Sequence, residues 1–199
     1  MTLVVLWRHG QTEWNRSHRI QGQTDTPLSP VGLEQAAESA PRVAALKPTV
    51  FISSDLQRAA TTAAALTAIT GMEPTFDPRL RERSFGEWEG LMHPEAIARW
   101  PEAFERWRRG DEVGEAGVEE IDAVAKRMLA ALHEAVDKAG PDGVVLAATH
   151  GAAARFATVA MVGLPMEYAP RFGPMHNCHR THLRRDPHRG WQLDAHNVP

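Results

Sequence analysis

Cysteine is almost absent from this sequence: Cys178 is the only one among 199 residues, so no disulfide can form within the chain. Secreted domains that depend on disulfide bridges for their stability are thereby excluded. A single thiol is compatible with the reducing conditions of the cytosol, and we expect a cytoplasmic protein.

Long hydrophobic runs are missing too. The apolar run from Leu3 to Trp7 follows no basic segment and is interrupted by Arg8, so it is too short for a signal peptide. The most apolar later stretch, residues 151–164, contains Arg155 and falls short of the length that crosses a bilayer. We therefore expect no membrane association.

Positive charge is not in excess, because 22 Lys and Arg stand against 25 Asp and Glu, a net charge of −3. Proteins that bind nucleic acids or anionic membranes normally carry a basic excess, and we expect neither partner. A few clustered arginines would still be enough to bind a small anion. The length predicts one domain over residues 1–199 with a substantial core, and a homodimer is compatible with it.

What the sequence contains is an alternation of short apolar strands and amphipathic helices. The expected strands cover residues 3–7, 50–52, 75–76 and 144–148, with two closing strands near 177–183 and 191–193. The expected helices cover residues 30–46, 56–70, 94–109 (as one or two pieces), 118–139 and 152–162. This alternation predicts an α/β fold with a largely parallel sheet.

A few residues are expected to limit these helices. Ser29 is an expected N-cap, and Pro30 suits the first helical position because its missing N–H leaves no bond unmade there. Pro41 predicts a kink or a break in the same helix. Residues 53–55 supply candidate caps for the next helix, which Gly71 is expected to close.

Cations and imidazoles follow three of the buried strands. Because the carboxyl ends of parallel strands meet at one edge of a sheet, where α/β proteins collect their ligands, we expect these residues to surround one pocket. The residues concerned are Arg8, His9, Gly10, Arg58, His150 and Gly151.

Taken alone, Arg8, His9 and Gly10 are equally compatible with a strand end that carries a solvated arginine and a hydrogen-bonded histidine. With the others they form a set of two imidazoles and two guanidinium groups, which would repel a metal ion. The same set suits a phosphoryl group, because guanidinium groups hold its charged oxygens and an imidazole can attack phosphorus.

The motifs and their order resemble those of the histidine phosphatase superfamily, which has the phosphoglycerate-mutase-like fold. The matching residues are Arg8, His9, Gly10, Thr12, Asn15, Gly22 to Asp25, Leu28, Ser29, Ser53 to Leu56, Arg58, Ala59, Thr62, Ala63, Leu80, Glu82, Gly86, Trp88 to Gly90 and Thr149 to Gly151. They span most of the chain, and the part after Leu164 is less diagnostic. The resemblance implies a three-layer α/β/α sandwich with a mostly parallel central sheet.

The resemblance also implies catalytic roles. His9 would attack phosphorus and form a phosphohistidine, for which its imidazole must be neutral. Glu82 would protonate the departing oxygen and then activate water. His150 would help to hold and stabilise the phosphoryl oxygens. Family members hydrolyse esters without a metal or an organic cofactor, so we expect neither.

The remaining residues implied by the resemblance bind the substrate phosphate. Arg8 and Arg58 would hold its oxygens, Asn15 would add a neutral hydrogen bond, and Gln21 and Gly151 are further candidates. Asn15 and Gln21 are also compatible with a simpler role as loop-capping residues.

Glu82 has alternatives as the proton donor. It lies between Arg81 and Arg83, so spacing alone favours a surface ion pair, and only the resemblance favours the proton donor. Glu87 and Glu89 are nearby rivals for the same role.

Four residues near the end of the chain, His176, Cys178, His179 and His182, have the residue types of a metal site. On a strand, however, His176 and His182 would share one face and His179 would point to the other. We therefore expect an ordinary sheet terminus here and no bound metal.

Several residues bear on the substrate side of the pocket. Trp107 to Arg109 resemble a segment that contacts substrate in the mutases, although basic residues at a helix end are also commonly solvated. Glu119 lies where relatives often carry a Gly-Glu-Ser motif, but different residues flank it here. Trp88, Trp100 and Phe104 are expected either to line the pocket mouth or to cover the core.

We therefore expect a histidine acid-type phosphatase that hydrolyses a small phosphate ester, such as a sugar phosphate or a phosphoglycerate derivative. The first alternative is a phosphoglycerate mutase primed by 2,3-bisphosphoglycerate. The second is an inactive binding module on the same fold, which would have no need for both imidazoles and the acid. The substrate is expected to be selected by the irregular region from Phe85 to Gly117.

Overall fold

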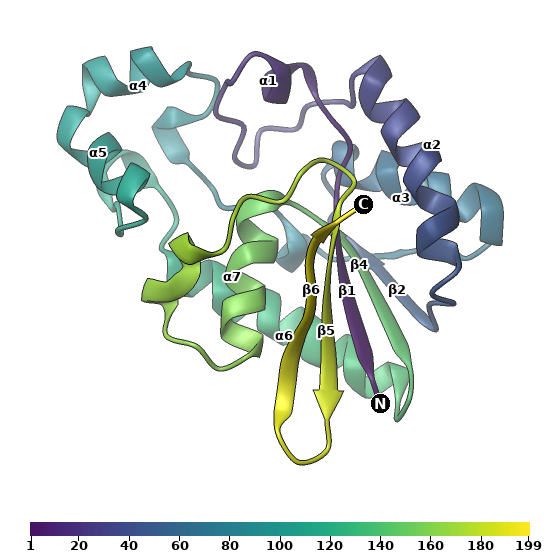
Figure 1. Ribbon diagram of the computed structural model, residues 1–199. Helices are drawn as coiled ribbons and strands as arrows, with labels where there is room; N and C mark the ends of the chain where they lie inside the picture. Colours follow the sequence, from purple (N-terminus) through teal and green to yellow (C-terminus); the bar gives the residue numbers. More distant parts are fainter.

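The computed structural model describes residues 1–199 and is built around a six-stranded sheet (Figure 1). The strand order is β3-β2-β4-β1-β5-β6; the first four strands are parallel, and β5 and β6 run antiparallel. The strands are β1 (Leu3–Arg8), β2 (Val50–Ser53), β3 (Thr75–Phe76), β4 (Val144–Thr149), β5 (Arg180–Asp186) and β6 (Gly190–Val198). The predicted α/β fold with a mostly parallel sheet is confirmed.

Helices cover both faces of the sheet, which gives three layers (Figure 1). The side chains of β1 alternate between the faces, as the pleat of a strand requires. Leu3, Val5 and Trp7 pack with α2 (Pro30–Ala44) and α3 (Gln57–Thr70) in one cluster. Val4 and Leu6 join a larger cluster with α6 (Ile121–Ala139) and α7 (Gly151–Met161) on the other face. The apolar run of β1 is therefore explained by burial on both sides.

Two expected helix limits differ in detail. The helix α2 continues through Pro41 to Ala44, so the proline does not break it. Residues 53–55 do not provide the side-chain cap at the first turn of α3. Instead, Asp25 reaches this turn from a distant loop. Its Oδ1 accepts a hydrogen bond from the backbone N–H of Gln57 at 2.8 Å. Gly71 closes α3 in the left-handed conformation as predicted.

A group of short helices and turns, which we call the cap, lies over the carboxyl ends of the parallel strands (Figure 1). It is formed by α1 (Glu13–Arg16), α4 (His93–Arg99), α5 (Pro101–Arg109) and the 3-10 turns η2 (Gly86–Trp88) and η3 (Glu115–Gly117), while the 3-10 turn η1 (Pro78–Leu80) packs on α6 through Leu80 in the main core. A third apolar cluster around the fully buried Trp88 holds this cap together, and Phe104 belongs to it. The 3-10 turn η4 (Met166–Arg171) follows α7. None of the helices has the length and apolarity needed to cross a membrane.

Candidate active site

The two predicted imidazoles meet at the carboxyl edge of the sheet. The parallel pairing of β1 with β4 sets Arg8 opposite Thr149, so the next residues, His9 and His150, leave the sheet side by side. The backbone N–H of His9 donates to the Thr149 carbonyl at 3.0 Å, and the ring centroids of His9 and His150 are 5.1 Å apart. Strand register thus brings together residues that are far apart in the sequence.

His9 is held in the tautomer that a nucleophile needs. Its Nδ1 lies 2.7 Å from the carbonyl oxygen of Gly10, which can only accept, so Nδ1 carries the proton and Nε2 keeps its lone pair. The pKa of His9 lies well below its ordinary value, because burial and then the charges of Arg58 and Arg8 disfavour an imidazolium. The ring is therefore neutral at physiological pH.

Gly10 is required by a close backbone approach. A Cβ at this position would lie 2.4 Å from the carbonyl oxygen of Gly32 at the start of α2. The N–H of Gly10 donates to the hydroxyl of Thr62, which in turn donates to the carbonyl of Arg58. The turn that presents His9 is thus packed directly against two helices.

Arg58 is fully buried beside His150. Its guanidinium donates to the carbonyls of Gly22 at 2.7 Å and Thr24 at 2.8 Å, and its Nε donates to Nδ1 of His150 at 3.2 Å. Burial lowers the pKa of Arg58 to about 10, so the group remains a cation near neutral pH. Three of its five N–H groups are engaged, and two are left for an anion.

His150 is oriented by its neighbours in the opposite tautomer to His9. Since Arg58 donates to its Nδ1, the proton is on Nε2, which lies 2.8 Å from the hydroxyl oxygen of Ser54. Burial and then the charge of Arg58 place the pKa of His150 well below its ordinary value. The site therefore contains two neutral imidazoles between guanidinium groups.

Arg8 has spare hydrogen-bonding capacity inside the site. Its Nη1 donates to the carbonyl of Met175, while its buried Nε has no partner in the protein. Burial lowers the pKa of Arg8 from its ordinary value. Gly151 lies next to this side chain, since a Cβ there would be 3.5 Å from Arg8 Nε. An anion at this point would satisfy a donor that is otherwise unpaired.

Asn15 and Gln21 are fixed through their oxygens by Thr12. The backbone N–H of Thr12 donates to Asn15 Oδ1 at 3.0 Å, and the Thr12 hydroxyl donates to Gln21 Oε1 at 2.8 Å. Thr26 donates to the same Gln21 oxygen at 2.9 Å. The amide nitrogens of both side chains make no hydrogen bond within the protein, so both remain available to a phosphate oxygen.

Glu82 does not form the surface ion pair that its sequence neighbours suggest. Arg81 pairs with Asp55, and Arg83 pairs with Glu112. The Glu82 carboxylate instead lies at the start of α7, where Oε1 accepts from Ala153 N at 2.8 Å and from Arg83 N at 2.9 Å, and Oε2 accepts from Ala152 N at 3.1 Å. The ion-pair alternative is therefore wrong, and a helix-capping role takes its place as the alternative to proton transfer.

The loop that carries Glu82 is clamped by Arg127 from α6. Arg127 donates to the carbonyls of Arg79 at 2.7 Å, Arg81 at 2.6 Å and Glu82 at 2.9 Å. Arg127 also pairs with Glu119 at 2.8 Å. No local pattern in the sequence indicates this clamp, because α6 and the loop are far apart along the chain. The role of Glu119 is therefore to hold Arg127 in place through this ion pair.

Glu89 is fully engaged and Glu87 is exposed, so neither resembles a proton donor aimed at His9. Glu89 accepts from the backbone N–H groups of Gln23 at 3.0 Å, Thr24 at 2.8 Å and Phe85 at 2.9 Å. It thereby holds the loop whose carbonyls contact Arg58.

The histidine-rich segment near the C-terminus does not form a metal cluster. Only residues 180–186 are in strand β5, so His176 and His179 lie in the preceding loop, and the expected strand alternation was wrong for them. Their rings are 5.1 Å apart, and His179 Nδ1 lies 2.9 Å from the carbonyl of Asn197. The same loop contributes Asn177, which the sequence analysis missed and whose Nδ2 donates to the His9 carbonyl at 3.0 Å.

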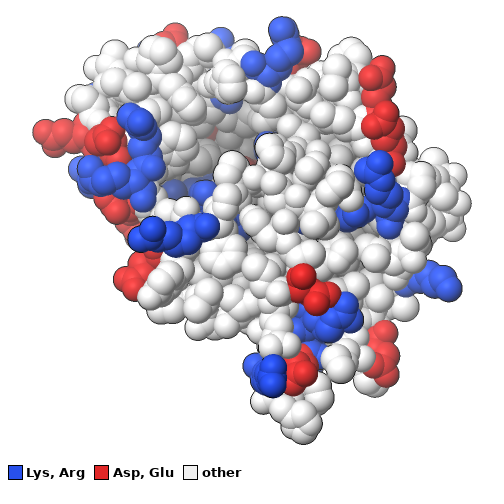
Figure 2. Space-filling view, viewed as in Figure 1, with Lys and Arg blue, Asp and Glu red and all other residues white.

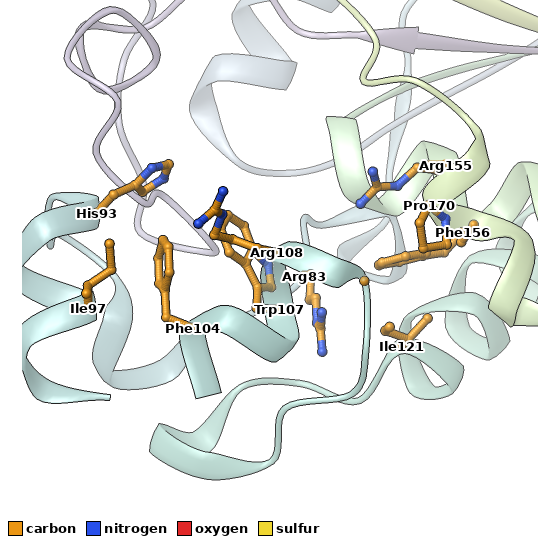
Figure 3. Close-up of a pocket in the computed structure, with 12 residues that line it drawn as sticks. Arg83, His93, Ile97, Phe104, Trp107, Arg108, Ile121, Arg155, Phe156 and Pro170 are labelled. Carbon is orange, nitrogen blue, oxygen red and sulfur yellow. The ribbon is translucent and has the colours of Figure 1, made fainter. Parts of the chain in front are cut away.

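A cavity of about 550 Å³ is lined by Arg83, the neighbour of Glu82 in the chain, and by Arg155 of α7, the helix whose first turn holds Glu82 (Figure 3). Trp107 and Arg108 line it as the resemblance implied, whereas Arg109 pairs with Asp111 at the surface. Its lining consists of Arg83, His93, Ile97, Phe104, Trp107, Arg108, Gly110, Ile121, Arg155, Phe156, Ala169 and Pro170. Phe104 thus both lines the cavity and packs in the cap, while Trp88 and Trp100 do not line it. Figure 2 shows a hollow on this face with Lys or Arg side chains in its wall.

The low pKa values of His9 and His150 predict acid-dependent stability. In the unfolded chain both rings bind a proton below about pH 6.5, whereas the folded chain binds none there, so stability falls as the pH drops through 6.5. Between pH 7.5 and 5.5 each histidine should lower the free energy of unfolding by about 1 kcal/mol.

Urea unfolding measured at pH 7.5 and at pH 5.5 tests this prediction. His9→Asn should reduce the loss, whereas replacement of the exposed His133 by Ala should not; equal losses in all three proteins would contradict the assignment.

Comparisons with known proteins agree with this geometry. The family model described as "Histidine phosphatase superfamily (branch 1)" matches residues 4–199. A glucosyl-3-phosphoglycerate phosphatase of Mycolicibacterium vanbaalenii is 39% identical over 98% of this chain and 94% of its own length. A probable phosphoglycerate mutase, GpmB, of Cronobacter sakazakii is 38% identical over 89% of this chain and 82% of its own. The solved structure of a mycobacterial glucosyl-3-phosphoglycerate phosphatase with VO3 superimposes with a TM-score of 0.92, at 35% identity and 99% coverage of both chains.

Proposed function

The chain belongs to the histidine phosphatase superfamily and is a phosphomonoesterase, and we propose that it removes phosphate from a sugar-bearing ester of phosphoglycerate such as glucosyl-3-phosphoglycerate. One observation carries the chemistry: the neutral imidazole of His9 lies between Arg8 and Arg58 with its Nε2 free. The choice of substrate is supported by the relatives of that name.

In the first proposed step, His9 Nε2 attacks phosphorus while the bond from phosphorus to the ester oxygen breaks. The Glu82 carboxyl gives its proton to that oxygen, so the alcohol leaves uncharged. Arg8, Arg58 and His150 stabilise the charge on the three equatorial oxygens. The product is a phosphohistidine at His9 with Glu82 ionised.

In the second proposed step, water attacks the phosphohistidine from the side that the alcohol has left. Glu82 accepts a proton from this water, and the bond from phosphorus to His9 Nε2 breaks. Inorganic phosphate departs, and His9 returns to its neutral tautomer, which the Gly10 carbonyl holds ready. Asn15 and Gln21 orient the phosphate through their free amide nitrogens, and the N–H end of α7 at Gly151 adds a favourable dipole.

The mutase alternative is favoured by the relative named as a probable phosphoglycerate mutase, and it makes a different kinetic prediction. A mutase must keep water away from its phosphohistidine until the product has reoriented. Here the cavity is open at its rim, where Ile97 is 43% exposed, and Arg109 is paired with Asp111 at the surface. Water therefore has access, and we expect hydrolysis to be much faster than transfer.

The experiment supplies 3-phosphoglycerate with a catalytic amount of 2,3-bisphosphoglycerate and follows 2-phosphoglycerate and free phosphate together. We expect phosphate release without isomerisation. Interconversion much faster than phosphate release would establish the mutase instead. The inactive-module alternative predicts neither product.

A release-of-phosphate screen tests the substrate. It compares glucosyl-3-phosphoglycerate with 3-phosphoglycerate, hexose phosphates, nucleoside monophosphates and p-nitrophenyl phosphate. We expect the highest kcat/KM on glucosyl-3-phosphoglycerate. A higher value on a nucleotide or a simple hexose phosphate would refute the proposed substrate but not the phosphatase activity.

A further inference from the structure

We infer that the cavity beside Glu82 is the subsite for the leaving group, and that Arg155 binds a carboxylate of that group. This inference rests on the proposed function and names the side chain that would give the enzyme its preference for acidic alcohols. Arg155 is not among the residues that the sequence motifs single out. The only signal for it is a lone charge within the apolar stretch 151–164.

Arg155 belongs to α7, the helix that begins at the reaction centre with His150 as its N-cap. The start of α7 holds Glu82 through the N–H groups of Ala152 and Ala153. Arg155 follows one turn later, about 6 Å along the helix axis from Gly151. Burial lowers the pKa of Arg155, and the negative charge of Glu82 opposes that shift, which places the two groups in one electrostatic environment. The cavity thus shares α7 with Glu82, because Arg155 and Phe156 of that helix line it.

Arg155 is the cavity arginine without a hydrogen-bond acceptor or a carboxylate partner. Its buried Nε has no acceptor, and its guanidinium lies over the ring of Phe156, 5.3 Å from the ring centroid. Arg83, by contrast, donates to the Glu119 carbonyl and pairs with Glu112, while Arg108 pairs with Glu105 at 3.3 Å. A buried N–H that lacks an acceptor is costly, so the Nε of Arg155 is poised to bind an anion from the substrate.

The spacing suits a carboxylate on a short alcohol. In an ester of 3-phosphoglycerate, four bonds of about 1.5 Å each join phosphorus to the carboxyl carbon. That chain is comparable in length to the rise of about 6 Å along the helix axis over the four residues from Gly151 to Arg155. A planar carboxylate can also take two parallel hydrogen bonds from a guanidinium, which a hydroxyl cannot.

The opposite wall of the cavity suits a larger substituent on the same alcohol. Figure 3 shows His93, Ile97 and Phe104 facing Arg155 and Phe156 across the cavity, with Trp107 and Arg108 between the two walls. The rings of Phe104 and Trp107 are 5.0 Å apart, and those of His93 and Trp107 are 5.7 Å apart. Such an aromatic wall offers an apolar surface of the kind that lines ligand sites, with room for a sugar ring beyond the carboxylate.

The test uses two substrates that differ only in the carboxylate, 3-phosphoglycerate and glycerol 3-phosphate. We expect the wild-type protein to prefer the acid, and Arg155→Ala to reduce the ratio of the two kcat/KM values roughly 30- to 100-fold, the effect of losing a buried charged hydrogen bond. Arg155→Lys should restore part of the preference because it keeps the charge. Arg109→Ala, which removes an exposed arginine of the same region, should leave the ratio unchanged.

Three other results would each refute one part of the proposal: the subsite, the role of Arg155 or the phosphatase chemistry. A wild-type protein without preference for the acid would refute the subsite even if Arg155→Ala failed to fold. An unchanged ratio in folded Arg155→Ala, or an equal change in Arg109→Ala, would refute the role of Arg155. Absence of phosphate release from p-nitrophenyl phosphate would instead refute the proposed phosphatase chemistry. Protein for each assay is checked by thermal denaturation.

Discussion

Replacing His9 by alanine should abolish turnover, lowering kcat by roughly 10⁴-fold or more, because no other group is placed to attack phosphorus. The same variant should lose the covalent intermediate. Brief incubation of the wild-type protein with ³²P-labelled substrate, followed by denaturation, should leave acid-labile phosphate on the chain, and His9→Ala should leave none.

The control for this experiment is His133→Ala, which replaces an exposed imidazole on α6. It should label and turn over as the wild-type protein does. Substantial turnover by His9→Ala would mean that another nucleophile, or water itself, attacks the ester directly. Label that survives in His9→Ala would point to a different histidine.

Replacing Glu82 by glutamine should slow esters of poor leaving groups by about 10²- to 10⁴-fold, because an alkoxide needs a proton as it departs. Hydrolysis of p-nitrophenyl phosphate should fall much less, since its oxygen leaves without protonation. The measurement compares kcat on glycerol 3-phosphate and on p-nitrophenyl phosphate for the wild-type and variant proteins.

Glu82 also caps α7 through Ala152 and Ala153, so the result has a competing structural explanation. A cap alone predicts equal losses on both substrates, together with a lower melting temperature. That outcome would remove Glu82 as the proton donor. A selective loss on the alkyl ester cannot come from a weaker helix start.

Much of the fold follows from local patterns. The apolar runs of β1 and β4 predicted buried parallel strands because a strand covered on both faces has no polar side. Gly71 predicted the end of α3 because only a residue that tolerates positive φ fits there. The cap of α3 was predicted wrongly, since Asp25 reaches it from a loop with no periodic relation to the helix.

The juxtaposition of His9 and His150 could also be predicted from the sequence, because parallel strands end at a common edge. The tautomers of the two rings could not. They depend on the Gly10 carbonyl and on Arg58, whose positions are set by packing between elements. The hydrogen bonds of Glu82 to the N–H groups of Ala152 and Ala153 could not be predicted either, because they depend on where α7 begins relative to the Glu82 loop.

The family, the layered α/β fold and the residue types available for phosphoryl transfer can be predicted from periodicity and from short ordered motifs. Which charges are paired and which are free depends on the packing of elements that are distant in the sequence. Arg81, Arg83 and Arg109 all find carboxylate partners. Arg155 has none, because the neighbours of a buried guanidinium are set by the packing of distant helices around the cavity.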